Sequence, residues 1–374
     1  MISFISFVYL IGILQGFILV PALFFRRANR TANRLLALLC LVFSLVLLDA
    51  YFTRINFYLG FPHFTLLILP IFFLIGPLLY FYSLFLTRRR EKFQKMDLRH
   101  LLPSFLVIVA FIPFYIKPGY EKIVDLDAYL IWIRTAQFLH VVQSFIYLYF
   151  AFRVLRRYQR HIADVYSQVE RINLNWLKIL LMVSAVLFGV YFLELLALLF
   201  FNWDFPYSYY GLILAIYLIG YWSMRQQPIA MPPESEEDHQ DEKSEIGRNR
   251  FEDGTVEQKV GALLNYMEKE KPYLEPSLNL NELAERLSFS PHNLSYIINS
   301  RLQKNFYQFV NHYRVEEVKR ALAGQRKQRE DLLRIAFEAG FNTKATFNTI
   351  FKSHTGMTPS EYRRQTINPP FPGA

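Results

Sequence analysis

The amino-acid sequence predicts an all-α protein: a bundle of seven transmembrane helices, followed by a cytoplasmic domain with two helix-turn-helix motifs in tandem. Three observations predict this architecture. The first 224 residues contain seven long apolar stretches, the residues from 256 onward carry apolar side chains at helical spacing, and an acidic segment separates the two parts. The chain therefore divides into residues 1–224, a linker at 225–255, a second domain at 256–366 and a tail at 367–374.

Composition excludes several classes of protein. Of the 374 residues, 53% are hydrophobic, which is too large a fraction for an intrinsically disordered chain. The single cysteine, Cys40, excludes a disulfide-stabilised scaffold. Because the apolar excess lies before residue 225, an entirely soluble enzyme does not fit either. The formal net charge of +10 does not by itself indicate nucleic acid, since residues 1–224 alone carry 20 Lys or Arg against 10 Asp or Glu.

Seven apolar stretches approach or exceed the roughly 20 residues that a helix needs to cross a bilayer. They are residues 3–25, 35–52, 64–86, 101–116, 129–152, 179–201 and 209–224. The first stretch has no basic segment before it and is too long for the apolar part of a signal peptide, so we expect a retained helix. In the third stretch, Pro70, Gly76 and Pro77 are candidates for a kink.

Basic residues are distributed unevenly among the loops between these stretches. The first, third and fifth loops carry 16 Lys or Arg, whereas the alternate loops carry three. Because basic loops stay in the cytoplasm, this bias predicts an outside amino terminus and places everything after residue 224 in the cytoplasm. We therefore expect a multi-pass protein of the bacterial cytoplasmic (inner) membrane.

Four side chains within the expected spans are candidates for sensing a signal, because polar groups are costly in a bilayer. They are Asp49, Arg134, His140 and Glu194. At 1.5 Å per residue, the two carboxylates and Arg134 fall at a similar depth in the outer third of the membrane. Two interpretations remain open: an ion-pair network that fixes helix packing, or a ligand pocket that opens to the outside. We expect His140 and Gln143 to form hydrogen bonds between helices rather than to bind a metal.

Residues 225–255 have the composition of a flexible acidic tether. Pro228, Pro232 and Pro233 prevent the preceding helix from continuing. The segment carries nine acidic and four basic residues and almost no apolar ones, so it cannot bury enough surface to fold. A flexible chain of 31 residues spans about 30 Å. Such a tether lets the second domain move while keeping it near the membrane.

The second domain opens with a pattern typical of a helix-turn-helix. Asn279 and Glu282 have the spacing of a capping box and begin a short helix. After a turn, Ser290 caps a second helix, with Pro291 at its first position. The apolar face of this second helix consists of Leu294, Ile297 and Ile298, and its opposite face is polar.

The same pattern occurs again after a long helix that we expect at residues 306–322. A short helix ends at Gly340, and a turn leads into another helix. This last helix buries Phe347, Ile350 and Phe351 and is expected to expose Lys344, Ala345, Thr346, Asn348 and Thr349. Two helix-turn-helix patterns joined by a long helix are a much more specific signal than one.

Residues 278–364, about a quarter of the chain, resemble the DNA-binding domain of the AraC/XylS family of transcription regulators. The most specific stretch is 340–363 (GFNTKATFNTIFKSHTGMTPSEYR), and 314–319 (RVEEVK) resembles the family's linking helix. The resemblance implies two recognition helices that enter successive major grooves on one face of DNA. Two positions depart from the family pattern: Gln303 stands where a glycine is frequent, and Ala345 stands where a serine is frequent.

Base readout needs hydrogen-bond donors and acceptors on the recognition helices. The candidates for base contacts are His292, Asn293, Tyr296, Asn299, Lys344, Thr346, Asn348 and Thr349. The candidates for phosphate contacts are Arg301, Lys304, Arg314 and Lys352. No zinc-spaced cluster of His and Cys and no phosphate-binding glycine loop occurs, so we expect no metal, no cofactor and no enzymatic activity.

The leading functional hypothesis is a membrane-embedded, sequence-specific transcription regulator that couples a signal to gene expression. Its expected partners are double-stranded DNA, the lipid bilayer, an unidentified small-molecule or membrane signal, and a second copy of the chain as a homodimer. The alternative is a membrane transporter or receptor whose helix-turn-helix tail is only regulatory.

Overall fold

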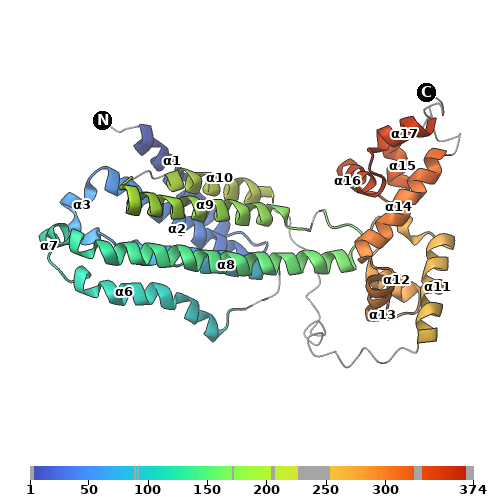
Figure 1. Cartoon of the computed structure of the whole chain (residues 1–374), viewed down its shortest axis with the longest axis horizontal. Helices are drawn as coiled ribbons and strands as arrows, with labels where there is room; N and C mark the ends of the chain where they lie inside the picture. The colour runs from blue at the N-terminus through green and yellow to red at the C-terminus, as the bar shows by residue number, and fades with distance from the viewer. Residues whose placement is uncertain are drawn as a thin grey trace. The chain divides into compact units, whose positions relative to one another are not determined.

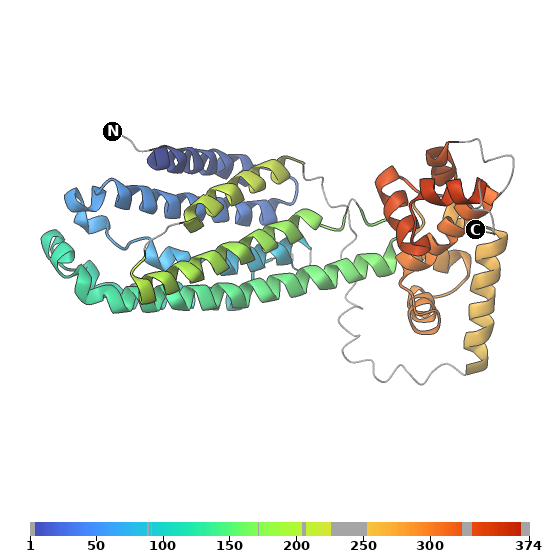
Figure 2. The same cartoon turned by 45° about the horizontal axis from the view of Figure 1, so that its top comes forward.

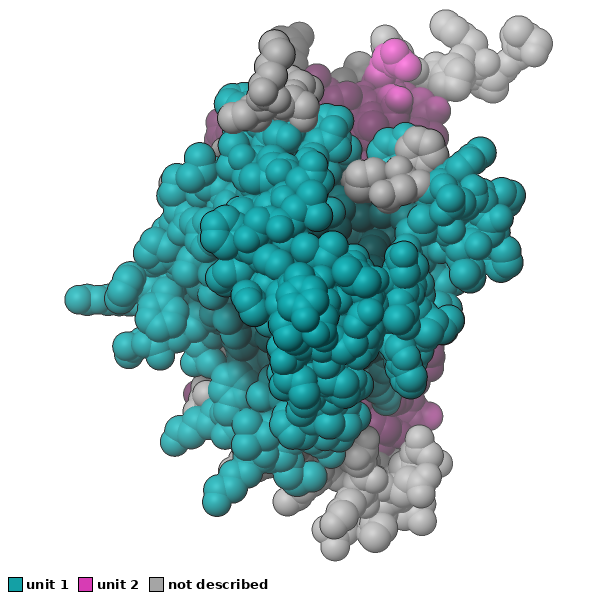
Figure 3. All heavy atoms as spheres, turned by 90° about the vertical axis from the view of Figure 1, so that its left-hand side faces the viewer, with its two compact units in different colours: residues 1–157, 174–235 teal, residues 158–173, 236–374 magenta. Residues whose placement is uncertain are grey.

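The structure is a computed structural model, and it describes residues 4–87, 90, 92–170, 172–203, 207–225, 253–323 and 331–367. Within these ranges all regular elements are helical, which confirms the all-α prediction, and one isolated β-bridge joins Tyr166 to Asn279. The chain forms two compact units, coloured separately in Figure 3. Unit 1 comprises residues 1–157 and 174–235, and unit 2 comprises residues 158–173 and 236–374.

Unit 1 consists of the apolar helices from the first part of the chain (Figure 1). The longer helices are α1 (Phe4–Phe24), α2 (Arg30–Arg54), α5 (Ile75–Leu86), α6 (Leu102–Tyr115), α8 (Leu130–Val165), α9 (Asn175–Phe201) and α10 (Tyr207–Arg225). Short helical turns connect them: α3 (Phe57–Gly60), α4 (Leu69–Phe72), α7 (Gly119–Val124) and 3₁₀ turns at Pro62–Phe64, Lys95–Leu101 and Leu126–Tyr129. Helix α1 packs against α2 and α10, α10 packs against α9, and α2 packs against α5 (Figures 1 and 2).

Among the described residues, five helical segments are long and apolar enough to cross a membrane, and a bent pair of helices raises the number to six. The five segments are Ile5–Phe24, Arg30–Arg54, Lys95–Tyr115, Leu126–Val165 and Asn175–Phe201. The last expected stretch forms α10, a helix of 19 residues. The total of seven spans therefore stays a prediction. Large apolar side chains such as Ile131 and Phe200 are exposed on the surface of these helices, a placement that is costly in water.

The bent pair occurs where proline and glycine predict a kink. The helical segments Pro62–Phe72 and Ile75–Leu86 meet at an angle of 40°. Pro77 lies four residues after Phe73, so its ring prevents a normal helical bond to the Phe73 carbonyl. That carbonyl instead accepts a hydrogen bond of 3.2 Å from the Gln143 side chain of α8. This bond between helices is the one that we expected for Gln143.

Besides the last residues of α8, unit 2 contains nine helical elements within its described residues. They are α11 (Asp253–Lys269), a 3₁₀ turn at Pro272–Leu274, α12 (Leu280–Arg286), α13 (Pro291–Tyr296), a π turn at Ile297–Arg301, α14 (Phe306–Ala323), α15 (Leu332–Glu338), α16 (Lys344–Thr355) and α17 (Pro359–Ile367). We call α12 and α13 the first motif, and α15 and α16 the second motif. The long helix α14 between them begins at the predicted residue and ends one residue later than predicted.

The two motifs have separate hydrophobic cores, and α14 contributes to both. The first core contains Tyr273, Leu278, Leu283, Leu294, Ile297 and Ile298 together with Phe306, Phe309 and Val310 of α14. The second core contains Ile335, Phe341, Phe347, Ile350 and Phe351 together with Val315, Val318 and Leu322 of α14. Each fully buried side chain of this size stabilises its core by about 1.5–3 kcal/mol. One continuous helix therefore connects two independently packed motifs.

The boundaries of the units add two facts to the expected domain organisation. Most of the expected acidic linker lies outside the described residues, as does nearly all of the tail, and α11 begins at Asp253 within the range expected for the linker. Residues 158–173, which the sequence analysis includes in the membrane domain, cluster with unit 2. They comprise the last residues of α8 and the loop before α9.

Candidate nucleic-acid interface and a cavity in unit 1

The first motif forms around the two predicted caps. The Asn279 side chain accepts a hydrogen bond of 3.0 Å from the backbone of Glu282, and the Glu282 carboxylate accepts one of 3.4 Å from the backbone of Asn279. These reciprocal bonds are a capping box. The Ser290 hydroxyl accepts a bond of 3.2 Å from the backbone of Asn293 and caps α13, where Pro291 occupies the first turn as expected.

Helix α13 and the π turn after it bury their apolar side chains and present their polar side chains to solvent. Leu294, Ile297 and Ile298 are buried in the first core. Of the residues that we expect to contact bases here, His292 and Asn299 are exposed, and Asn293 and Tyr296 are half-buried. Of the expected phosphate contacts, Arg301 is exposed and Lys304 is half-buried. The side chains of the first recognition helix therefore remain accessible.

The turn after the first motif has a strained backbone at Gln303, where the family resemblance leads us to expect glycine. Gln303 has φ of +53°, in the left-handed region that side chains with a β-carbon rarely adopt. Its side-chain amide donates a hydrogen bond of 2.8 Å to the Ser300 carbonyl. The turn thus keeps a left-handed residue although Gln303 replaces the expected glycine.

The second motif repeats the arrangement with different caps. The Asp331 side chain caps α15 by accepting a bond of 3.1 Å from the backbone of Leu333. The Thr343 hydroxyl caps α16 by accepting one of 3.1 Å from the backbone of Thr346. Along α16 the polar face that points to solvent contains Lys344, Ala345, Asn348, Thr349 and Lys352.

Thr346 corrects one expectation. Its exposed fraction is only 8%, and its hydroxyl lies 3.0 Å from the Thr343 hydroxyl, within hydrogen-bonding distance. The expected exposure of Thr346 is therefore wrong, because the side chain turns back toward the cap of its own helix. It is not accessible for a base contact in this structure.

Arg314 corrects a second expectation. It lies on α14, but it is fully buried, with 0% of its surface exposed. The guanidinium donates hydrogen bonds of 2.8 Å to the Tyr273 carbonyl and 2.9 Å to the Glu275 carbonyl. Burial lowers the pKa of Arg314 to about 10. Arg314 is therefore an internal support of unit 2 and not a phosphate contact.

Two histidines that the sequence analysis did not single out meet where α14 packs against α16. The ring centroids of His312 and His354 are 5.8 Å apart. Burial lowers the pKa of both imidazoles below their usual value, and the nearby positive charge of Lys304 lowers it further. The two residues are 42 positions apart on different helices, so no local pattern in the sequence indicates this pairing.

Unit 1 contains a cavity of about 500 Å³ that brings together three of the residues expected to sense a signal. Asp49 of α2, Arg134 of α8 and Glu194 of α9 all line it. The Asp49 carboxylate accepts a hydrogen bond of 2.5 Å from the Tyr58 hydroxyl. The Glu194 carboxylate accepts bonds of 2.7 and 2.6 Å from the backbone and hydroxyl of Ser208. Two acidic side chains and one basic side chain therefore line the same cavity.

His140 does not line that cavity. It is buried among aromatic rings, including Phe72, Phe73 and Phe188, and lines a smaller adjoining cavity of about 60 Å³ that shares Tyr191 and Tyr209 with the first. Its ring nitrogen lies 3.4 Å from the Ser144 hydroxyl of the same helix, so this contact is not the expected bond between helices. Among the described residues, no group of three or more His, Cys, Asp or Glu side chains could hold a metal ion.

Comparison with known proteins agrees with the geometry of unit 2. Residues 283–365 match the protein family described as "Helix-turn-helix domain". An uncharacterized HTH-type transcriptional regulator of Staphylococcus aureus (strain COL) is 32% identical over 105 residues, which are 28% of this chain and 13% of that protein. The melibiose operon regulatory protein of Escherichia coli (strain K12) is 28% identical over 101 residues, which are 26% of this chain and 32% of that protein.

The family match covers the carboxy-terminal part of the chain, and this chain spans less than a third of the length of each of the two relatives. No solved structure matches the chain. The matched region begins within α12 and contains the rest of the first motif, the linking helix α14 and the second motif, whose turn into α16 carries the family resemblance. Residues 283–365 are a helix-turn-helix domain of the AraC type.

Proposed function

We propose that the protein is a membrane-embedded transcription regulator that binds specific DNA sequences and couples a signal to gene expression. The observation that carries this proposal is the pair of helix-turn-helix motifs joined by α14. Helix α14 has 18 residues and is about 27 Å long. This length is comparable with the roughly 34 Å of one turn of B-DNA, so two recognition helices can reach successive major grooves. The regulator names of the relatives support the same role.

In this proposal the accessible polar side chains of α13 and α16 read base edges. They are His292, Asn293, Tyr296 and Asn299 in the first motif, and Lys344, Asn348 and Thr349 in the second. Arg301, Lys304 and Lys352 lie beside them and neutralise phosphates. Phosphate contacts set affinity and its dependence on salt, whereas base contacts set sequence preference.

The apolar helices of unit 1 support a location in the membrane. Their large exposed apolar side chains would be costly in water and favourable against lipid. The 16 basic residues in alternate loops support an orientation with the amino terminus outside and unit 2 in the cytoplasm. A second copy of the chain remains a candidate partner, because many regulators bind DNA as dimers.

The cavity in unit 1 supports a sensing role for Asp49, Arg134 and Glu194. Its volume of about 500 Å³ is in the range of small-molecule sites. A guanidinium and two carboxylates on one wall suit a small ligand that carries charges of both signs, such as a zwitterion. Thermal unfolding of the protein in lipid nanodiscs, with each of the common amino acids added, tests this choice. A ligand at 100 times its Kd stabilises by about 2.7 kcal/mol, and the Arg134→Ala variant should lose that gain.

The DNA-binding function is tested with the full chain in nanodiscs and a library of randomised duplexes. Repeated selection should enrich one family of sequences, which the protein then binds at least about 10³-fold more tightly than unrelated DNA. The Ser360→Ala variant changes an exposed side chain of α17 and is the matched control, with unchanged enrichment expected. If selection at low salt enriches no sequence, the proposed function is wrong.

A further inference from the structure

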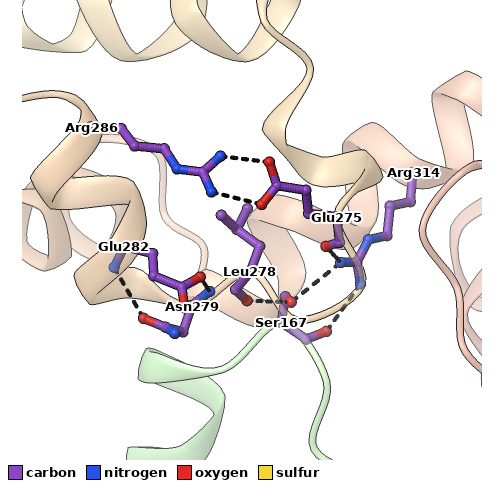
Figure 4. Close-up of polar contacts among 7 residues, drawn as sticks. All are labelled: Ser167, Glu275, Leu278, Asn279, Glu282, Arg286 and Arg314. Carbon is purple, nitrogen blue, oxygen red and sulfur yellow. Dashed lines mark hydrogen bonds and ion pairs between the residues drawn. The ribbon is translucent and has the colours of Figure 1, made fainter.

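A loop that lies between two apolar helices in the sequence is part of the packed interior of unit 2. Residues 166–170, which we call the clamp segment, follow α8 and belong to unit 2. Ser167 is 1% exposed. Its backbone and its hydroxyl donate hydrogen bonds of 3.4 and 2.5 Å to the Leu278 carbonyl (Figure 4), and the neighbouring Tyr166 forms the bridge to Asn279. The clamp segment is therefore attached to the chain just before the first motif.

Ser167 also supports the buried charge of Arg314. The guanidinium donates hydrogen bonds to the carbonyl and the hydroxyl of Ser167, at 3.4 and 3.3 Å (Figure 4). Its other partners are the carbonyls of Tyr273 and Glu275 and the side chain of Asn311. Among the described residues, no carboxylate lies within ion-pairing distance of this guanidinium. All hydrogen bonds of this buried guanidinium go to uncharged groups, and the Glu170 carboxylate of the clamp segment stabilises the charge only from a longer distance. Loss of Ser167 therefore leaves buried donors without partners.

The next residue reaches the second motif. The Gln168 side chain donates a hydrogen bond of 3.2 Å to the Gly340 carbonyl and accepts one from the Asn342 side chain. Gly340 and Asn342 form the turn that leads into α16. The Tyr307 hydroxyl of α14 donates a bond of 3.2 Å to the Glu170 carboxylate. Four of the five residues of the clamp segment thus contact the start of the first motif, the linking helix or the second motif.

These contacts lie between two cores that share only α14. None of the hydrogen bonds of the clamp segment within the described chain involves a side chain proposed above to read bases. The clamp segment therefore leaves the recognition faces uncovered. Its contacts restrict how the two motifs can turn relative to one another.

We propose that residues 166–170 are an intramolecular clamp that docks on Arg314 and fixes the relative orientation of the two helix-turn-helix motifs for joint binding to DNA. This inference rests on the proposed DNA-binding function. If the orientation of the motifs is fixed before binding, less conformational entropy is lost when both motifs bind DNA. The affinity then rises without any new contact to DNA. Because the clamp segment is covalently continuous with α8 and α9, a rearrangement of those helices can release it and weaken binding.

The first arm of the test measures orientation without DNA. Nitroxide labels are attached at Ser300→Cys and Ser353→Cys, both exposed, in a Cys40→Ala background of the full chain in nanodiscs. Double electron–electron resonance then gives the distribution of distances between the first and second motifs. We expect a narrow distribution in this background and a clearly broader one with Gln168→Ala. Val169→Ala, which removes no side-chain hydrogen bond, is the matched control and should leave the width unchanged.

The second arm measures binding of the unlabelled full chain to the duplex that it selects, and to a shortened duplex with only one of the two groove sites. Gln168→Ala should weaken binding to the complete duplex about threefold to tenfold. It should change binding to the shortened duplex less than about twofold. Gln168→Glu retains the acceptor for Asn342 and loses the donor to Gly340, so its effect should be intermediate. If Gln168→Ala does not fold, the milder Gln168→Glu variant still tests the proposal.

The two arms separate the clamp from the function on which it rests. An unchanged distance distribution in both Gln168 variants overturns the clamp, as does equal weakening on the complete and shortened duplexes. Tighter binding of Gln168→Ala to the complete duplex also overturns it, because the docked segment would then inhibit binding. If the parent protein selects no duplex, the proposed function fails, and the distance distribution alone still decides whether the segment fixes the motifs.

Discussion

Gly340 lies so close to Tyr273 that a β-carbon on Gly340 would stand 2.4 Å from the Tyr273 carbonyl oxygen. The same atom would stand 2.9 Å from Nε of Arg314. Gly340 also has φ of +93°, in the left-handed region that favours glycine. Tyr273 belongs to the first core, and Gly340 begins the turn into α16 of the second motif. The first core and the second motif therefore meet at a position where only glycine fits.

Replacing Gly340 with alanine should destabilise unit 2 by about 2–4 kcal/mol. About 1–2 kcal/mol comes from the left-handed backbone and the rest from the clash with the Tyr273 carbonyl. Hydrogen exchange of the α14 amides in the full chain, as a function of denaturant, measures the change. Gly356→Ala is the matched control, since Gly356 has φ of +77° but open space around it. If both variants lose the same stability, the close contact of Gly340 with the Tyr273 carbonyl does not contribute to the destabilisation.

Replacing Gln303 with glycine should stabilise unit 2 by up to about 1 kcal/mol. Glycine removes the cost of φ at +53°, and its greater freedom in the unfolded chain offsets part of the gain. Gln308→Gly, in the right-handed backbone of α14, should have the opposite sign and cost about 0.5–1 kcal/mol. The same exchange measurement gives both values. Destabilisation by Gln303→Gly would show that the side-chain bond to Ser300 outweighs the backbone strain.

Acid should destabilise unit 2 through His312 and His354 as the pH falls through the ordinary imidazole pKa of 6.5. Burial and then Lys304 lower the pKa of both imidazoles in the folded state, while Glu316 opposes the shift and Lys319 adds to it. The unfolded chain therefore binds more protons around this pH, and stability rises with pH. The stability that the two neutral imidazoles contribute is fully present above their ordinary pKa of 6.5, and it is lost as the pH falls toward their lowered pKa in the folded state.

Paired His312→Gln and His354→Gln substitutions should flatten that slope. Glu275 and Glu317 also stabilise the fold, with pKa values below the ordinary 4.5, so their contribution is lost only at more acidic pH. For Glu317, burial raises the pKa, but hydrogen bonds from Lys271 and Tyr273 outweigh it. Exchange rates corrected for intrinsic pH dependence measure the slope. An identical slope in the double variant would exclude the histidines as its source.

Asn348 and Lys352 should affect DNA binding in different ways. Asn348→Ala should remove a base contact, cost about 1–3 kcal/mol and relax the preference at one base pair. Lys352→Ala should weaken binding to all sequences and reduce the salt slope by about 1, because one phosphate contact is lost. Fluorescence anisotropy with the selected duplex and its single-base variants, at several salt concentrations, separates the two effects. A uniform loss in both variants would contradict the assignment of Asn348 to base readout.

Features set by local spacing were predictable from the sequence. The caps at Asn279 and Ser290 were predicted because a cap depends on residues three positions apart. The linking helix was predicted to within one residue, because its apolar positions recur at helical spacing. The common level of Asp49, Arg134 and Glu194 followed from counting depth along the helices, and all three line one cavity. Their role in sensing stays a prediction.

Features set by distant contacts were not predictable. Thr346 is a separate case, because a local contact with the Thr343 cap turns its hydroxyl inward. Arg314 has the charge of a phosphate contact, and its burial depends on carbonyls about 40 residues away in the chain. The bond from Ser167 to Leu278 spans 111 residues. No periodicity in a single sequence records such pairs.

The central claim is that two recognition helices of one chain bind DNA together. Hydroxyl-radical and methylation protection of the selected duplex, with the full chain in nanodiscs, tests it most directly. We predict two protected major-groove segments about 10 base pairs apart on one face of the duplex. Asn348→Ala should remove base protection in one segment, and Asn299→Ala should remove it in the other. A single protected segment that both variants affect equally would contradict the claim.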